Sequence, residues 1–228
     1  MLRGIKAVGF DMDGTFLETH VDYGKLELAD RNVLKVHGIP FDEVYPEPDW
    51  KRKRANIRLW LEEHDRTDEF QTIYDEIDEA FTEVELEFVH EARPYPGSLE
   101  CISELRSRGY VVGLLTRGSI RYAETALSHA GASGIFDVVM GRDSIYYDDA
   151  KPSPVAMIEF SKRLGVEPPE LLYVGDNITD WFSARDAGSS YAGVLTGNGE
   201  ATGWSDVDPG IHVIEYAGDV KDLLPRRL

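Results

Sequence analysis

The sequence predicts an α/β fold: a mostly parallel β-sheet flanked by helices, with a separate α-helical domain inserted after the first strand. Three observations predict it. A short apolar run, residues 5–10, ends abruptly at an aspartate. Residues 23–91 are then rich in Glu, Asp, Leu and Ala. From residue 92 onward, short apolar runs alternate with helical segments, which is the pattern of parallel strands joined by helices.

The first strand is predicted over residues 5–10, where the β-branched Ile5 and Val8 stand in a run that stops at Asp11. The insert that follows is predicted to be helical because its apolar residues recur at helical spacing. These residues are Leu59, Leu61, Phe70, Ile73, Ile77, Phe81, Val84 and Phe88. Prolines divide the insert into at least two helical pieces, since proline interrupts a helix.

The rest of the chain alternates between strands and helices. Helices are predicted at four places, each followed by a glycine: residues 97–108, 120–130, 155–164 and 180–187. Strands are predicted at residues 110–115, 136–140, 171–175, 191–195 and 213–214. Such a series forms a parallel sheet with helices on both faces. We therefore expect a core domain of residues 1–17 and 92–228 and a helical cap domain of residues 18–91.

The composition is strongly acidic. The 228 residues include 42 acidic and 24 basic side chains, which gives a formal net charge of −18. This charge argues against binding to nucleic acid or to an anionic membrane surface through bulk electrostatics. Only eight of the basic residues are lysines. Acidic excess with few lysines suggests a protein adapted to a saline cytoplasm, and an ordinary acidic protein is the alternative.

Hydrophobic residues make up 42% of the chain, which is enough to form a buried core. The longest apolar runs are far shorter than the roughly 20 residues of a membrane span. The first residues contain no apolar core of a signal peptide. The single cysteine, Cys101, is expected in the core, and the cytoplasm is the expected location.

Polar residues follow several of the predicted strands, and carboxyl ends of parallel strands meet at one edge of the sheet. These residues stand in four segments: Asp11-Met12-Asp13-Gly14-Thr15, Thr116-Arg117-Gly118, Lys151-Pro152, and Gly175-Asp176 with Asp180 four residues later. Four aspartates, a hydroxyl group and a lysine are therefore expected to converge. Neighbouring carboxylates favour a bound cation, and oxygen ligands without His or Cys favour a hard ion such as Mg²⁺.

These segments, DMDGT, LLTRG, KPSP and VGDNITD, resemble the four ordered motifs of the haloacid dehalogenase superfamily. The resemblance covers residues 5–17 and 92–215, and the insert is similar to the helical cap of the phosphoglycolate phosphatase and β-phosphoglucomutase branch. It implies a Rossmann-like core and a Mg²⁺-dependent enzyme. That enzyme would cleave a phosphomonoester of a small metabolite through an aspartyl-phosphate intermediate.

The resemblance also implies catalytic roles. Asp11 would be the nucleophile, and Asp13 would protonate the leaving oxygen and then activate water. Thr116 would donate a hydrogen bond to a phosphoryl oxygen, and Lys151 would neutralise phosphate charge. Arg117 stands where Asn is frequent in the family, and it is expected either to reach the substrate or to pair with a surface acid.

Metal ligation is implied in the same way. Asp11, the backbone carbonyl of Asp13 and Asp176 would bind Mg²⁺, and Asp180 would ligate it or orient the other ligands. Asn177 stands where Ser is frequent in the family. Asp176 and Asp180 have an alternative role as caps of the following helix.

Three alternatives to a phosphatase remain open to different degrees. A phosphomutase would need a cap that retains the intermediate. A dehalogenase is disfavoured, because that branch lacks the second acid that corresponds to Asp13. A phosphate-accepting signalling module would also have an acidic pocket for Mg²⁺, but Asp13 and the long insert argue against it.

The cap contains one basic patch, which we define as Lys51, Arg52, Lys53, Arg54 and Arg58. Lys51, Arg54 and Arg58 share one helical face, which could attract an anionic substrate. The favoured alternative is a solvated face paired with nearby acidic residues: Glu62, Glu63 and Asp65. Residues 196–203 are rich in glycine, and they either border the active site or form an ordinary turn.

Overall fold

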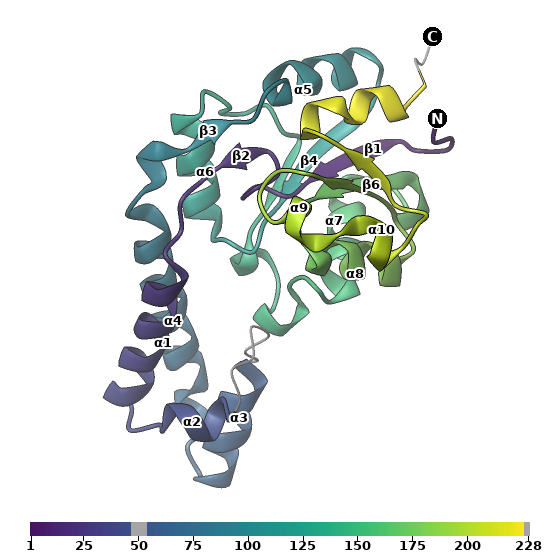
Figure 1. Ribbon diagram of the computed structural model, residues 1–228. Coiled ribbons are helices and arrows are strands. Elements are labelled where there is room, and N and C mark those ends of the chain that lie inside the picture. The colour runs from purple at the N-terminus through teal and green to yellow at the C-terminus, as the bar shows by residue number, and fades with distance from the viewer. Residues whose placement is uncertain (47–53, 226–228) are drawn as a thin grey trace. The chain divides into compact units, whose positions relative to one another are not determined.

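The computed structural model describes residues 1–46 and 54–225, and the chain divides into two compact units (Figure 1). The first unit comprises Met1–Thr19 and Val89–Leu228, and the second comprises His20–Phe88. The first contains a six-stranded sheet in the order β5-β4-β1-β6-β7-β8, in which all neighbouring strands are parallel. This arrangement confirms the predicted fold class.

The sheet is built from short strands, which are β1 (Ala7–Phe10), β4 (Val111–Leu115), β5 (Val138–Met140), β6 (Leu171–Gly175), β7 (Ser190–Val194) and β8 (His212–Ile214). β1 is buried along its whole length, because it lies between β4 and β6. Phe10 of β1 is in register with Leu114 of β4 and with Val174 of β6. The residues that follow these three strands therefore emerge side by side at one edge of the sheet.

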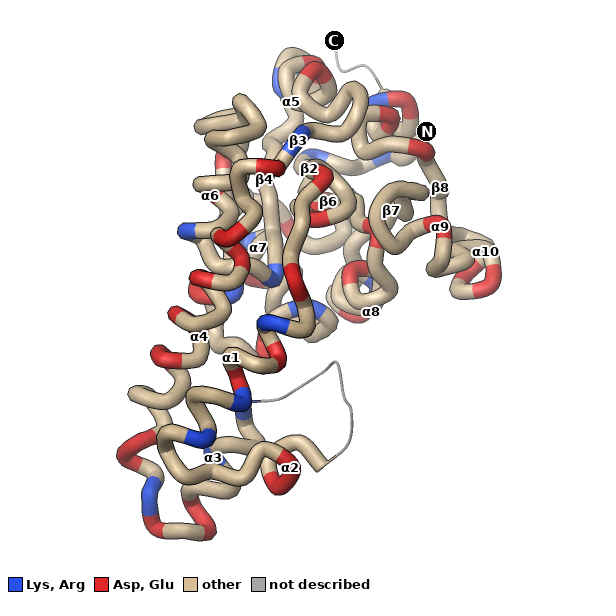
Figure 2. The backbone as a smooth tube through the Cα atoms, turned by 60° about the vertical axis from the view of Figure 1, so that its left-hand side comes forward, with Lys and Arg blue, Asp and Glu red and all other residues tan. Residues whose placement is uncertain are grey.

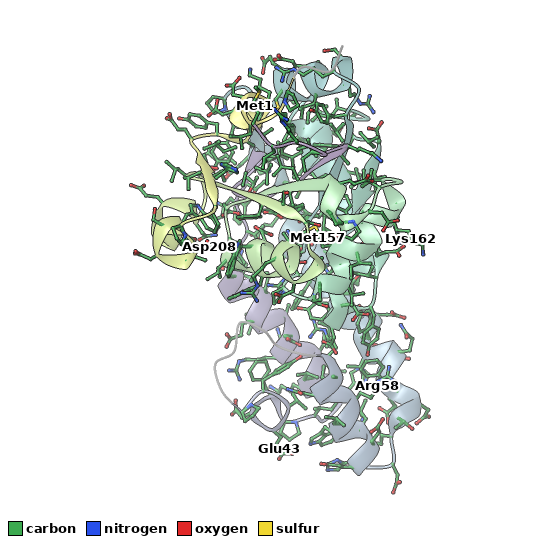
Figure 3. All side chains as sticks on the ribbon, turned by 90° about the vertical axis from the view of Figure 1, so that its right-hand side faces the viewer. Met1, Glu43, Arg58, Met157, Lys162 and Asp208 are labelled. Carbon is green, nitrogen blue, oxygen red and sulfur yellow. The ribbon has the colours of Figure 1, made fainter. Side chains whose placement is uncertain are left out.

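Helices cover the sheet on both faces: α5 (Ser98–Ser107), α6 (Ile120–His129), α7 (Pro154–Arg163) and α8 (Ile178–Ala187). α7 and α8 pack against each other, and Figure 1 shows them on the opposite side of the sheet from α5. On α7, Met157 is buried in the core while Lys162 projects outward, as Figure 3 shows. Buried apolar residues of α7 and α8 form one core with the sheet.

The helix after Asp176 begins earlier than the sequence predicted. α8 starts at Ile178 rather than Asp180, because the side chain of Asn177 accepts a hydrogen bond from the backbone N–H of Thr179 and caps the helix. A short antiparallel pair, β2 (Leu17–Glu18) with β3 (Arg93–Pro94), was not predicted from the sequence. Two short helices were missed as well, α9 (Gly199–Thr202) and α10 (Trp204–Val207).

The second unit is helical, with α1 (Tyr23–Val36), α2 (Phe41–Val44), α3 (Arg54–Glu63) and α4 (Phe70–Leu86). α1 and α4 make the most extensive contact in this unit, and residues from all four helices form its core. The short 3₁₀-helix Thr67–Glu69 leads into α4. Acidic residues are spread along the helices, whereas Lys and Arg are fewer (Figure 2).

The basic patch of the insert differs from the prediction. Lys51, Arg52 and Lys53 lie outside the described residues. Arg54 does not lie on a solvated face: it is 2% exposed, and its guanidinium contacts the buried carboxylate of Asp30 at 3.3 Å. The sequence could not indicate this burial, because the carboxylate that compensates the charge of Arg54 is on another helix. The guanidinium of Arg58 lies 4.2 Å from the centre of the Phe70 ring.

Cys101 is fully buried on α5, as predicted, and its thiol is free. Burial raises the pKa of this thiol to about 12. Within residues 1–46 and 54–225, no helix has the length and hydropathy needed to cross a membrane.

Candidate active site

A buried lysine lies at the carboxyl edge of the sheet. Lys151 is 3% exposed, and its Nζ lies 2.6 Å from Asp11 Oδ1 and 2.7 Å from Asp180 Oδ1. The ammonium also donates to the Leu115 carbonyl at 3.1 Å and to the Tyr173 hydroxyl at 2.8 Å. Burial alone would lower the pKa of Lys151, but Asp11 and Asp180 outweigh this effect and raise it. The lysine therefore stays charged although it is buried.

Three carboxylates lie close together here, and two of them contact Lys151. Asp11, Asp176 and Asp180 are buried, and one oxygen of each lies within 4.8 Å of the others. Burial raises the pKa of Asp11 well above its usual value, Lys151 opposes the rise, and Asp180 and Asp176 add to it. Burial and the charge of Asp180 also raise the pKa of Asp176, to about 6. Burial is the main cause of both shifts, and the neighbouring carboxylates add to it.

The residues present fit a divalent cation. When all three carboxylates are ionised, the cluster of Asp11, Asp176, Asp180 and Lys151 has two negative charges that the ammonium does not compensate. The three carboxylates offer only oxygen atoms as metal ligands, which suits a hard ion. The group thus has the charge and the donor type that a site for a divalent metal requires.

Asp176 is held by groups from two separate loops. The hydroxyl of Thr15 donates to Oδ1 at 3.1 Å, and Asn198 donates to Oδ2 from its backbone N–H at 2.7 Å and from Nδ2 at 3.1 Å. Gly14 and Gly197 both have positive φ, and a side chain on either would approach Asp176 Oδ2 to 2.7 Å or less. Glycine is required there because the two loops pack directly against the carboxylate. The glycine-rich segment 196–203 therefore borders the site.

The side chain of Asp13 lies among hydroxyl groups. Thr19 and Tyr122 donate to Asp13 Oδ1 at 2.7 Å and 2.6 Å, and Thr116 donates to Oδ2 at 3.2 Å. Thr116 is itself fixed, because its Oγ1 accepts a hydrogen bond from the backbone N–H of Gly118 at 3.0 Å. Hydroxyl groups can donate or accept, so these partners suit a carboxyl group in either protonation state.

Asp180 has two structural roles at once. Its Oδ1 contacts Lys151, and its Oδ2 accepts a hydrogen bond from the backbone N–H of Asn177 at 3.1 Å. The second contact closes a capping box with Asn177 at the start of α8. Capping is therefore one role of Asp180 in addition to its place in the carboxylate cluster.

The structure brings together most of the residues singled out in the sequence: Asp11, Asp13, Thr116, Lys151, Asp176 and Asp180. The side chain of Asp13 is not part of the three-carboxylate cluster. Arg117 is half-buried beside Thr116, and among the contacts of the described residues none joins its side chain to this group.

Four residues that contact the group were missed: Thr19, Tyr122, Tyr173 and Asn198. Thr15, which donates to Asp176, stood in the first motif without an assigned role. Tyr173 and Tyr122 occupy ordinary apolar positions of a strand and a helix, where an aromatic residue signals only burial. Asn198 lies in the glycine-rich segment 196–203, and that composition was the one feature of the sequence that pointed to it.

A carboxylate follows strand β1 of the parallel sheet and contacts a buried lysine, with two further aspartates beside it. This arrangement defines a class of hydrolase. The sequence matches the model of haloacid dehalogenase-like hydrolases over residues 5–188, and the chain belongs to that family. This match confirms the resemblance carried by the four motifs.

Two curated relatives match this chain over most of its length and over most of their own. It is 28% identical to the N-acetylmuramic acid 6-phosphate phosphatase of Pseudomonas aeruginosa, over 98% of this chain and 96% of that protein. It is 29% identical to a phosphoglycolate phosphatase of Aquifex aeolicus, over 85% of this chain and 86% of that protein. The family and these names confirm the predicted enzyme class, a phosphatase.

Solved structures share the fold. A predicted phosphoglycolate phosphatase from Haemophilus somnus has a TM-score of 0.63 at 21% identity, covering 98% of this chain and all of that one. A putative β-phosphoglucomutase from Thermotoga maritima has a TM-score of 0.60 at 22% identity, covering 96% of this chain and all of that one.

Proposed function

We propose that the protein is a Mg²⁺-dependent phosphatase that hydrolyses a small phosphomonoester, with Asp11 as the nucleophile. The observation that carries the proposal is the buried contact of 2.6 Å between Asp11 and Lys151 beside two further carboxylates. A carboxylate is already a nucleophile and needs no base. What the reaction requires is neutralisation of the charge on the phosphate, for which Lys151 is suitably placed.

In the first step, an oxygen of Asp11 forms a bond to phosphorus while the ester P–O bond breaks. The electron pair of that bond stays on the leaving oxygen, which takes a proton from Asp13. Thr116 donates a hydrogen bond to a phosphoryl oxygen. The product of this step is an alcohol and a phosphorylated Asp11.

In the second step, Asp13 removes a proton from water, and the water oxygen attacks phosphorus. The bond between Asp11 and phosphorus breaks, which releases inorganic phosphate and restores the carboxylate. Asp13 carries a proton again after this step and is ready for the next substrate.

The proposed metal ligands are Asp11, Asp176, Asp180 and the backbone carbonyl of Asp13. Mg²⁺ is the proposed ion because it favours carboxylate and carbonyl oxygens. When bound, it supplies positive charge that stabilises the phosphoryl oxygens in the transition state.

The proposed substrates are small phosphorylated metabolites such as phosphoglycolate or a sugar 6-phosphate, in line with the names of the relatives. The helical unit is proposed to act as the cap that selects among them. We also propose a cytoplasmic location, because the sequence has a single cysteine and therefore no internal disulfide, as is usual for proteins of reducing compartments.

Release of inorganic phosphate tests the proposal. The wild type and Asp11→Asn are incubated with Mg²⁺ and phosphoglycolate, N-acetylmuramic acid 6-phosphate or glucose 1-phosphate. We expect the wild type to release phosphate from at least one compound and the variant from none. Equal activity of the two proteins would refute the nucleophile. Isomerisation of glucose 1-phosphate without phosphate release would identify a phosphomutase instead.

A further inference from the structure

The phenolic hydroxyl of Tyr122 makes the shortest of the three contacts to Asp13. It donates to Oδ1 at 2.6 Å, whereas the contact of Thr116 with Oδ2 measures 3.2 Å. Tyr122 is 1% exposed, so water does not compete for this hydrogen bond. The proposed reaction assigns Tyr122 no role, although it contacts the residue that must transfer protons.

Tyr122 is held firmly by its own helix. It lies in the first turn of α6, where its backbone N–H donates to the side chain of the N-cap residue Ser119 at 3.2 Å. Its ring lies against Gly118, where an added Cβ would come within 2.6 Å of the ring. Gly118 therefore makes room for the ring, and the ring in turn carries the hydroxyl to Asp13.

We propose that Tyr122 is a positioning residue that anchors Asp13 Oδ1 and leaves Oδ2 to transfer the proton. This inference rests on the proposed role of Asp13 as the acid and base. Oδ1 has two contacts of 2.7 Å or less, from Tyr122 and Thr19, and Oδ2 has one longer contact among those of the described residues. The ester oxygen takes its proton from Oδ2, and Tyr122 keeps its own proton throughout.

A positioning role predicts an effect that depends on the leaving group. Nitrophenolate leaves without much help from an acid, whereas phenolate needs the proton. Removing the Tyr122 hydroxyl leaves Oδ1 with the Thr19 contact alone among those of the described residues and loosens the Asp13 carboxyl, which impairs proton transfer and leaves the attack of Asp11 intact. A hydroxyl that only stabilised the fold would slow both substrates equally.

The test compares kcat/KM for 4-nitrophenyl phosphate and phenyl phosphate at one pH with saturating Mg²⁺. Tyr122→Phe keeps the ring and removes the oxygen. The control is Tyr110→Phe, which also removes a buried hydroxyl, one that donates to the Pro225 carbonyl at 3.0 Å. Tyr110 directly precedes β4, at the opposite end of that strand from Thr116. Thermal melting of both variants confirms that they are folded.

We expect Tyr122→Phe to lose about tenfold on phenyl phosphate, equivalent to one ordinary hydrogen bond, and less than about threefold on 4-nitrophenyl phosphate. Tyr110→Phe should match the wild type on both. Equal losses on the two substrates, or no loss on either, would overturn this inference while the proposed function stands. A wild type inactive on every phosphomonoester would overturn the proposed function and this inference with it.

Discussion

Replacing Lys151 with methionine removes the only positive charge that the described residues bring into contact with Asp11 and Asp180. The change keeps an unbranched side chain of similar length. It leaves two buried carboxylates without the ammonium that lies 2.6 Å and 2.7 Å from them. The protein should therefore lose stability whenever no metal ion is bound.

The magnitude follows from the burial of the pair. Removing one partner of a buried ion pair costs about 3–5 kcal/mol. Burial already raises the pKa of Asp11, so uptake of a proton by this carboxyl offsets part of the loss, and we expect about 3 kcal/mol. For a chain of this size, that corresponds to a fall in melting temperature of about 6–12 °C.

The assay is thermal unfolding followed by circular dichroism near neutral pH, with EDTA and then with excess Mg²⁺. The matched control is Lys162→Met, on α7, where the lysine side chain is 78% exposed and its nearest acid, Glu159, lies at 3.5 Å. A surface pair of this kind contributes at most about 1 kcal/mol, so the control should melt close to the wild type. Mg²⁺ should recover part of the loss in Lys151→Met, because it binds the folded state.

The reasoning would be refuted if Lys151→Met and Lys162→Met melted at the same temperature in EDTA. That result would mean that the carboxylates near Lys151 do not depend on its charge. If Lys151→Met lost as much stability relative to the wild type with Mg²⁺ as without it, the placement of the metal beside this lysine would be contradicted.

Three further predictions test the metal, the thiol and the surface charge. EDTA should abolish phosphatase activity and Mg²⁺ should restore it, while Ca²⁺ should inhibit, because Ca²⁺ prefers longer bonds and more ligands; full activity in a metal-free sample would contradict the site. Cys101 should not react with a thiol reagent in the folded protein near neutral pH. Burial raises its pKa to about 12, and the reactive thiolate forms only as the pH approaches that value. Labelling at equal rates before and after denaturation would contradict this burial. The melting temperature should rise from dilute buffer to about 1 M KCl at constant Mg²⁺, because screening relieves the repulsion of a net charge of −18; a flat or falling curve would discard adaptation to salt.

Most of the sheet and its edge could be predicted because they depend on local sequence. Residues 171–175 form a continuous apolar run and become β6 with the same limits. Asp11 and Asp176 could be placed together, since each follows a strand and parallel strands end at one edge. The start of α8 was misjudged, because Asp180 was taken as the first helical residue when Asn177 is the cap.

The contacts between distant residues could not be predicted. Tyr122 lies 109 positions from Asp13, and no periodicity in the sequence connects them. Arg54 belongs to a basic run, and its burial depends on Asp30, which lies 24 positions earlier on another helix. Whether a charged side chain is buried depends on a partner that only the tertiary structure supplies.

Covalent labelling of Asp11 tests the central claim most directly. Asp13→Asn should slow turnover by about 10² or more and accumulate phosphoenzyme, because water is no longer activated. This variant is mixed with Mg²⁺ and 4-nitrophenyl phosphate, whose leaving group needs little help from an acid. The sample is quenched with acid and digested, and the peptides are analysed by mass spectrometry. We predict one added phosphoryl group on Asp11 that hydroxylamine removes and that is absent from the Asp11→Asn/Asp13→Asn double variant. A phosphoryl group on another residue, or unchanged labelling in the double variant, would contradict Asp11 as the nucleophile.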